Sequence, residues 1–256
     1  MAAGDEVGRY RLEAQLRQGA WRAVDSQTGE RVRLRYVDPF GEAPVFLAGA
    51  RRLCTLDEPR ILTLRDAGVD TAGEAWVAEP WQPGETLAER VARLGPLPAD
   101  QLLVVAEALL SGLAAAHARG ICDGAITPER LRISGESPLR VQLVCPGLAA
   151  LIMDLVPDPM FSAPEGSVPT VPADLFGTAA TLCFAATGQT VPSGRALELA
   201  APRLPTPLVD TLRMCLDPDP SDRPHSVGAL LRTVEALRAG TLDWGDRPAE
   251  PARAPA

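Results

Sequence analysis

The chain lacks lysine and asparagine altogether, so all 25 basic residues among its 256 are arginine. Their absence excludes any mechanism that depends on a lysine amine or an asparagine amide. Histidine is almost absent too, because only His117 and His225 are present. Two histidines leave little material for a histidine metal site or a serine hydrolase. We expect His117 to be a structural residue at a helix end.

Cysteine pairs, long apolar runs and excess positive charge are missing as well. The five cysteines form no C-x-x-C pair and lie in apolar segments, which indicates reduced, buried thiols. Polar residues interrupt each apolar run before the roughly 18 residues that a membrane span needs. The acidic N-terminal stretch has no signal-peptide pattern. The net charge of -8 argues against a nucleic-acid-binding surface. We therefore expect a cytoplasmic protein, or the cytoplasmic part of a longer one, without direct membrane insertion.

The hydrophobic periodicity changes along the chain from that of strands to that of helices. Alternating residues over 9–37 predict an antiparallel meander, followed by a helix over 45–56 and strands over 61–67 and 75–78. Helices are then predicted over 86–94, 98–118, 174–187, 207–216 and 226–239, with short strands over 131–133 and 141–144. The pattern predicts an α+β chain. Its β-rich part spans 5–80, its helical part spans 81–240, and 241–256 form a Pro/Ala-rich tail or linker.

Several ordered motifs identify a family resemblance. Residues 117–133 read His-Ala-Arg-Gly-Ile-Cys-Asp-Gly-Ala-Ile-Thr-Pro-Glu-Arg-Leu-Arg-Ile, 161–165 read Phe-Ser-Ala-Pro-Glu, and 217–224 read Asp-Pro-Asp-Pro-Ser-Asp-Arg-Pro. In this order they resemble the catalytic loop, the Ala-Pro-Glu motif and the late Arg-Pro motif of bacterial Ser/Thr protein kinases. The resemblance covers residues 9–239 and implies a two-lobed fold, with a β-rich N-lobe containing one helix and a mainly helical C-lobe.

The resemblance implies that structural residues of the family are retained. Glu165 and Arg223 are expected to form an ion pair, and Asp174 is expected to brace the catalytic loop from below. Breaking such a pair on one side, if it is buried, costs about 3 to 5 kcal/mol because a charge is left without its partner.

The residues expected to carry phosphoryl transfer are replaced. The resemblance places Arg35 at the strand lysine, Gly49 at its helix glutamate and Ala125 at the catalytic aspartate. Thr127 falls at the catalytic-loop lysine, Arg130 at the metal-binding asparagine and Cys145 at the aspartate of Asp-Phe-Gly. Phosphoryl transfer depends on these groups acting together. We therefore expect a pseudokinase with no catalytic residues, no bound metal and no cofactor.

The nucleotide cleft is expected to be altered as well, at Arg33, Arg35, Glu79, Gln82 and Arg132. The Gly-rich loop is cut to residues 16–21 with one glycine, and alternation along a strand puts Arg33 and Arg35 on one face. That face is either solvent-exposed or, as the resemblance implies, turned into the cleft with Arg130 and Arg132. Because guanidinium groups cannot be buried together without an anion, we hypothesise that a Glu79 to Arg35 pair plugs the pocket.

The expected role is protein binding, as a scaffold or regulator, with weak or absent ATP binding. Partners that the resemblance suggests are an active kinase, an envelope protein, or a forkhead-associated-domain protein that reads phosphorylated Thr170. An alternative is an unconventional enzyme on a kinase fold, for example a nucleotidyl transferase. Another is a cleft that binds an anionic ligand. The substrate-docking helix within 188–207 is expected to be truncated.

Overall fold

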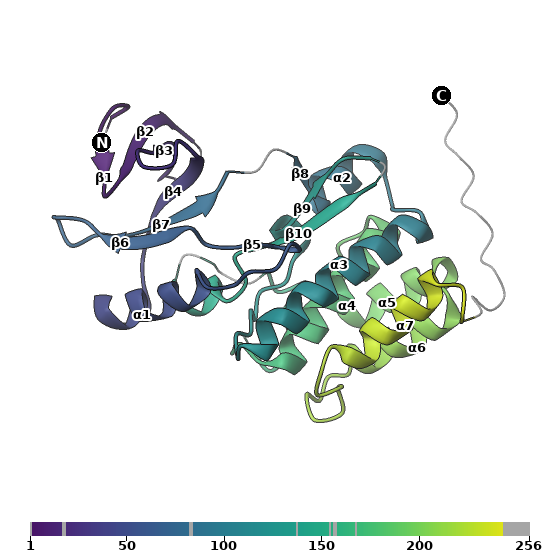
Figure 1. The fold of residues 1–256 in the computed structure, drawn as a ribbon. Coiled ribbons are helices and arrows are strands. Elements are labelled where there is room, and N and C mark those ends of the chain that lie inside the picture. Colours follow the sequence, from purple (N-terminus) through teal and green to yellow (C-terminus); the bar gives the residue numbers. More distant parts are fainter. Residues whose placement is uncertain are drawn as a thin grey trace.

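The structure, a computed structural model, describes residues 2–16, 19–81, 84–136, 138–153, 155, 158–166 and 168–242. The chain forms a β-rich lobe with one helix and a mainly helical lobe (Figure 1). The two-lobed α+β architecture expected from the sequence is confirmed.

The N-lobe is a six-stranded antiparallel sheet. Its strands lie in the order β1 (Glu6–Val7), β2 (Tyr10–Gln15), β3 (Ala20–Asp25), β4 (Arg31–Val37), β7 (Ala75–Pro80) and β6 (Asp66–Val69). On one face Tyr10 and Trp76 meet edge to face, with ring centroids 5.7 Å apart. Apolar residues alternate along β2 and β4, so that each strand buries one side against this core.

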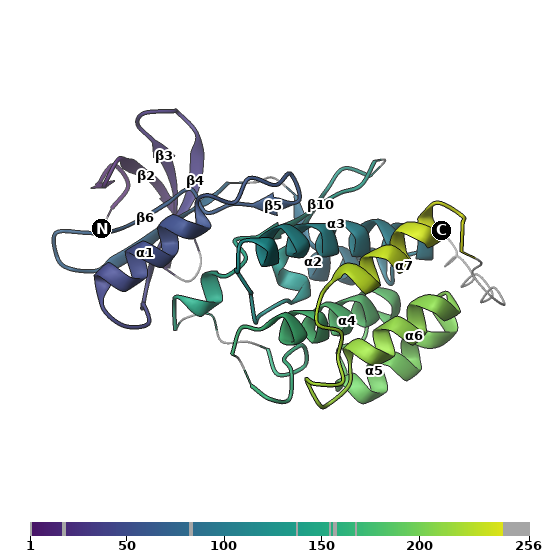
Figure 2. The same cartoon turned by 60° about the horizontal axis from the view of Figure 1, so that its bottom comes forward.

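Helix α1 (Ala43–Leu53) connects the N-lobe sheet to the second lobe. Its buried side, formed by Phe46, Ala50 and Leu53, packs in a cluster that also contains Leu148 and Ile152 from the C-lobe. The helix begins two residues before the predicted start and ends three residues before the predicted end. Figure 2 shows α1 below the N-lobe sheet.

The predicted strand over 61–67 is wrong as a single element. Its start, β5 (Ile61–Leu62), pairs in parallel with β10 (Arg140–Val144), whereas its end is β6 in the N-lobe sheet. The chain leaves one sheet for the other between these strands, where the Thr63 hydroxyl donates to the Leu56 carbonyl. Together, β5, β10, β9 (Leu131–Ser134) and β8 (Glu85–Thr86) form a four-stranded sheet.

The C-lobe contains helices α2 (Leu87–Leu94), α3 (Ala99–Ala118), α4 (Val171–Thr187), α5 (Ser193–Ala200), α6 (Thr206–Cys215) and α7 (Gly228–Arg238). Helix α2 begins with a capping box in which Thr86 and Glu89 each accept the other's backbone N–H. Helix α4 is buried along nearly its whole length. The segment 188–207, where a truncated helix was expected, contains the eight-residue α5 and a short 3-10 turn, Ala201–Arg203.

Helix α3 is long and apolar enough to cross a membrane, judged by length and composition alone. The interrupted apolar runs of the sequence had predicted no segment of this kind. It instead supplies a large part of the C-lobe core, where Leu102, Leu109 and Leu113 are buried. Core helices of this kind satisfy the same length and composition test as membrane spans. Figures 1 and 2 both show α7 lying along α3.

Candidate functional site: a cleft containing buried guanidinium groups

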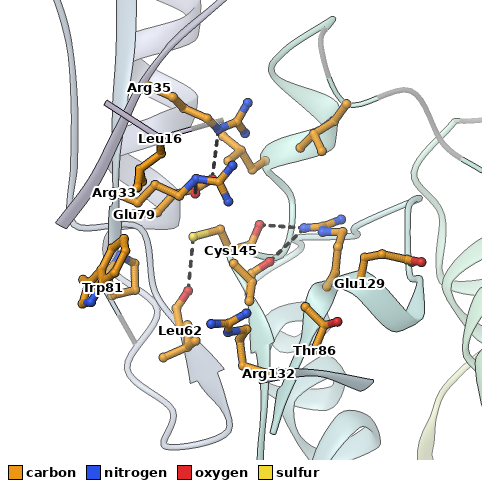
Figure 3. A pocket seen from close by; sticks show the side chains of 15 residues that line it. Leu16, Arg33, Arg35, Leu62, Glu79, Trp81, Thr86, Glu129, Arg132 and Cys145 are labelled. Carbon is orange, nitrogen blue, oxygen red and sulfur yellow. Dashed lines mark hydrogen bonds and ion pairs between the residues drawn. The ribbon is translucent and has the colours of Figure 1, made fainter. Parts of the chain in front are cut away.

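A cavity of about 570 Å³ lies between the lobes, in the place where the kinase resemblance puts the nucleotide (Figure 3). Strands β4 and β7 supply one wall, and the loop 123–130 with β9 and β10 supplies the other. The described side chains in its walls are Leu16, Arg33, Arg35, Leu62, Glu79, Pro80, Trp81, Thr86, Glu129, Arg130, Arg132, Val144, Cys145, Leu148 and Leu155. All four arginines expected in the cleft therefore line one cavity.

The upper wall of the cavity carries an ion pair. Arg33 and Glu79 are directly opposite each other in β4 and β7, and Arg35 lies on the same face two residues on. The Arg35 Nε donates to the Glu79 carboxylate at 3.2 Å, and the Arg33 Nε lies 3.9 Å from the other oxygen. The Glu79 to Arg35 pair thus forms, but it does not fill the pocket, because the cavity remains beside it. The hypothesis that this pair plugs the pocket is therefore corrected: the pair forms, and the cavity stays open beside it.

The lower wall carries a second, more deeply buried pair. Arg130 donates to the carboxylate of Asp123, whose side chain is fully buried. The same guanidinium donates to the carbonyl oxygens of Ala125 at 3.1 Å, Val144 at 2.9 Å and Cys145 at 3.0 Å. Arg130 therefore makes its hydrogen bonds within the C-lobe, and its anion is Asp123, whereas Glu79 was the anion expected for the arginines of the cleft.

Asp123 organises the backbone around this pair. One carboxylate oxygen accepts the N–H of Ala125 at 3.1 Å and the other accepts the N–H of Gly147 at 3.2 Å. Burial raises the pKa of Asp123, and the charge of Arg130 opposes that rise. The sequence contained a signal for this arrangement, since an aspartate lies two residues before Ala125 in the altered catalytic loop and an arginine replaces the asparagine of that loop. The pairing of the two was nevertheless missed.

Cys145 lies at the expected metal-ligand position and faces the cavity (Figure 3). Its Sγ donates to the Leu62 carbonyl at 3.2 Å, and burial raises the pKa of the thiol well above its usual value. Among the described residues outside glycine, it alone has a positive φ, 42°. A neutral, hydrogen-bonded thiol is a poor ligand for Mg²⁺, which takes hard oxygen ligands.

Gly49, at the expected position of the helix glutamate, faces the segment after Cys145. A Cβ atom there would lie 2.6 Å from Cδ2 of Leu151, so Leu151 occupies the space a side chain would need. The backbone reinforces this contact, because the Phe40 N–H donates to the Leu151 carbonyl at 2.8 Å. The missing side chain is therefore compensated by apolar packing between α1 and the C-lobe.

The remaining expected site residues lie around these groups. Ala125 and Thr127 are buried beneath the cavity, and Arg132 donates to the Gly84 carbonyl at 2.9 Å. Gln82, expected in the hinge, lies outside the described residues, as do two positions of the shortened Gly-rich loop.

The loop 123–130 is held from below by Asp174, as the resemblance implies. Its carboxylate accepts the N–H of Asp123 at 3.0 Å and of Gly124 at 2.6 Å, and it lies 2.7 Å from Nε2 of His117. The one group in the described residues with metal-ligand spacing is also here, since ligand atoms of His117, Cys122 and Asp174 lie within 4.8 Å of one another. The hydrogen bonds already engage His117 and Asp174, so metal binding would have to displace them.

A second structural interaction that the kinase resemblance implies is the ion pair of Glu165 with Arg223; together with the Asp174 contacts we call it the frame of the C-lobe. The Nη1 and Nη2 atoms of the fully buried Arg223 side chain donate to the two oxygens of the Glu165 carboxylate at 2.6 and 2.7 Å, a bidentate geometry. Its Nε donates to the Asp217 carbonyl at 2.7 Å, and the guanidinium stacks on Phe176 with 4.9 Å to the ring centroid. The hydrogen bonds from Arg223 lower the pKa of Glu165.

The fold and the cleft define this chain as a protein of the protein-kinase-like fold class, of the type found in actinobacteria. The kinase domain of PknI from Mycobacterium tuberculosis matches with a TM-score of 0.73 at 20% identity, covering 92% of this chain and 98% of that chain. The structure of Rad53 in complex with AMP-PNP matches with a TM-score of 0.68 at 17% identity, covering 88% and 64%. At these identities the likeness establishes the fold alone.

Sequence relatives agree with this class. The chain is 28% identical over 194 residues to the probable serine/threonine-protein kinase PkwA of Thermomonospora curvata, covering 68% of this chain and 26% of PkwA. It is 26% identical over 219 residues to the serine/threonine-protein kinase PknK of Mycobacterium tuberculosis, covering 75% of this chain and 20% of PknK. The chain thus spans about a quarter or less of the length of these relatives. No family model matches it.

Proposed function

We propose that this chain is a catalytically inactive pseudokinase that acts by binding a protein partner, as a scaffold or regulator. The observation that carries the proposal is the Asp123 to Arg130 pair. It puts a fixed guanidinium, bound to a carboxylate and three carbonyl oxygens, where the kinase resemblance calls for a metal-binding asparagine. Phosphoryl transfer relies on metal ions and on an aspartate to orient the acceptor hydroxyl. Neither requirement is met by Ala125, Arg130 and Cys145.

Loss of these groups removes most of the electrostatic stabilisation of the transition state. The loss of a general base alone lowers a rate by about 100-fold to 10,000-fold. The retained frame, Asp174 with Glu165 and Arg223, keeps the C-lobe folded without contributing to chemistry. A stable two-lobed surface without a catalyst fits a binding role, in the cytoplasm or in the cytoplasmic part of a longer protein. An active kinase, an envelope protein or a forkhead-associated-domain protein is a partner consistent with this proposal.

Radiolabel transfer with ATP and either Mg²⁺ or Mn²⁺ tests the proposal. The purified chain should transfer no phosphate or nucleotide to itself or to generic acceptors, whereas an active bacterial Ser/Thr kinase assayed in parallel should do so. Transfer that co-purifies with the chain and disappears in an Asp123→Asn variant would overturn the proposal. It would instead support the unconventional enzyme, because Asp123 is an acidic side chain hydrogen-bonded to the backbone of Ala125 and Gly147, beside the altered catalytic positions.

A second candidate is that the cleft binds an anionic small molecule without a metal. The observation in its favour is the cavity of about 570 Å³, which is within the range of ligand pockets and has Arg33, with a side chain 42% exposed, in its wall. Isothermal calorimetry with inorganic phosphate, pyrophosphate and citrate tests it. Saturable heat that an Arg33→Gln variant loses supports this candidate, and an absence of heat rejects it.

A further inference from the structure

Two segments far apart in the sequence expose apolar side chains next to each other. Phe40, which precedes α1, is 50% exposed, and Met153, which follows the altered Asp-Phe-Gly motif, is 48% exposed. Pro39 and Ile152 form an antiparallel bridge between them, and the Met153 N–H donates to the Asp38 carbonyl at 2.7 Å. Ile152 is completely buried, whereas the next residue, Met153, is exposed.

A third exposed apolar side chain lies at the start of helix α1, five residues after Phe40. Val45, in its first turn, is 66% exposed although its neighbour Phe46 is completely buried. Scattered exposed apolar residues are normal, whereas several on adjoining elements mark an interaction site. We call Phe40, Val45 and Met153 the apolar patch.

An acidic hollow adjoins the apolar patch. A depression of about 410 Å³ is lined by Tyr36, Asp38, Pro39 and Glu74, so that it begins at the two residues preceding Phe40. Glu74 in its wall is exposed, and none of its described lining residues is basic. Beside it, Asp70 accepts the Tyr36 hydroxyl at 3.0 Å, and hydrogen bonds lower the pKa of Asp70, which keeps that carboxylate ionised. The surface next to the patch is therefore negatively charged.

We propose that the apolar patch and the acidic hollow together dock a partner segment that carries an aliphatic or aromatic anchor and, beside it, an arginine or lysine. The anchor would cover Phe40, Val45 and Met153, and the basic side chain would enter the hollow toward Glu74. This proposal rests on the protein-binding function proposed above and names the chemistry of the partner. Interfaces combine an apolar centre with complementary charge, and arginine is enriched in them.

Charge argues against a second copy of this chain as the occupant. A symmetric dimer would use the same patch on both subunits and would therefore bring two acidic hollows, each containing a Glu74, into one interface. The chain already carries a net charge of -8, so such a contact would bring like charges together. A basic segment from a different protein avoids this repulsion.

A phage-displayed library of random 12-residue peptides, selected on the intact chain, tests the proposal. We expect enriched peptides to contain a basic residue next to an aliphatic or aromatic one. Synthetic copies should bind in fluorescence anisotropy, and Phe40→Asp should weaken binding by about tenfold or more, the effect expected of an interface anchor. Glu74→Arg should weaken it several-fold and make it less sensitive to salt. Leu94→Asp, a change at an exposed leucine 55% accessible on α2, is the matched control and should have no effect.

The alternative outcomes separate this proposal from the function on which it rests. Peptides that bind equally well to the Phe40→Asp variant would overturn the docking surface and leave a protein-binding pseudokinase in place. Enrichment of acidic peptides, or of none, would overturn it too, as would self-association that Phe40→Asp abolishes in light scattering. Phosphate transfer in the radiolabel assay would overturn the proposed function independently. Thermal melting of each variant checks that the fold is retained.

Discussion

The C-lobe frame and the interlobe cleft each contain an arginine paired with a carboxylate. Only the arginine of the frame stands where the kinase resemblance also has an arginine. In the frame, Arg223 binds Glu165 and backbone carbonyl oxygens, at a motif position that the kinase resemblance also gives to arginine. In the cleft, Arg130 binds Asp123 and backbone carbonyl oxygens, where the resemblance calls for asparagine. A buried arginine is tolerated at both places because its donors are satisfied locally.

We interpret the cleft as a structural element like the frame. A kinase cleft leaves its charged side chains available for nucleotide and metal. Here Arg130 and Arg35 are each committed to a carboxylate of the chain itself. If the interpretation is correct, restoring kinase-like residues in the cleft should reduce stability without creating activity.

The largest expected effect is at the frame. Arg223→Ala should lower the free energy of unfolding by about 3 to 5 kcal/mol, because it removes a large buried side chain and leaves the carbonyl oxygens of Asp217 and Pro172 without their donor. Urea denaturation followed by circular dichroism measures the change. Arg213→Ala is the control, because that exposed arginine pairs with an exposed Asp210 and should contribute little. Equal effects of the two variants would show that the frame is not held by this pair.

The next effect tests whether the cleft pair is equally structural. Arg130→Asn restores the residue of the kinase resemblance and should lower the free energy of unfolding by about 2 to 4 kcal/mol, because Asp123 remains buried without its cation. Melting in the presence of ATP and Mg²⁺ should show no shift that the wild type lacks. Arg140→Asn, at an exposed position of β10, is the matched control. Unchanged stability, or a new response to ATP, would show that Arg130 does not stabilise the cleft as Arg223 stabilises the frame.

A smaller effect is expected where α1 meets the C-lobe. Gly49→Glu restores the helix glutamate of the resemblance, but its Cβ would lie 2.6 Å from Leu151 Cδ2, so overpacking should cost about 1 to 3 kcal/mol. Gly194→Ala in α5, which meets nothing within 4 Å, should instead be slightly stabilising. Combining Gly49→Glu with Leu151→Ala should recover part of the loss. If it does not, Leu151 is not the group that Gly49 accommodates.

The sequence allowed some of these contacts to be predicted and not others, for a physical reason. The ordered motifs and hydrophobic periodicity identified the two-lobed fold. The Arg35 to Glu79 pair was predictable because strand alternation puts Arg33 and Arg35 on one face, and the kinase resemblance places Glu79 beside the strand lysine position. The contact of Leu151 with Gly49 depends on the path of an irregular segment, which periodicity does not encode. The switch of β5 to the second sheet was missed because a short apolar run carries no signal of its partner strand.

The smallest expected effect is a pH dependence that belongs to the frame. The pKa of Glu165 is lowered from its ordinary 4.5 by hydrogen bonds from Arg223, so its carboxylate stabilises the fold above that value. This contribution should be lost as the pH falls through the lowered pKa, because the unfolded state then binds the proton more readily. Glu165→Gln should therefore differ most from the wild type near neutral pH and approach it as the pH falls below about 4.5. Chemical denaturation across that range measures the difference, with Glu58→Gln as the control. If the difference in the free energy of unfolding between the two proteins stays constant with pH, Glu165 stabilises the frame by packing and not by the attraction between its carboxylate and Arg223.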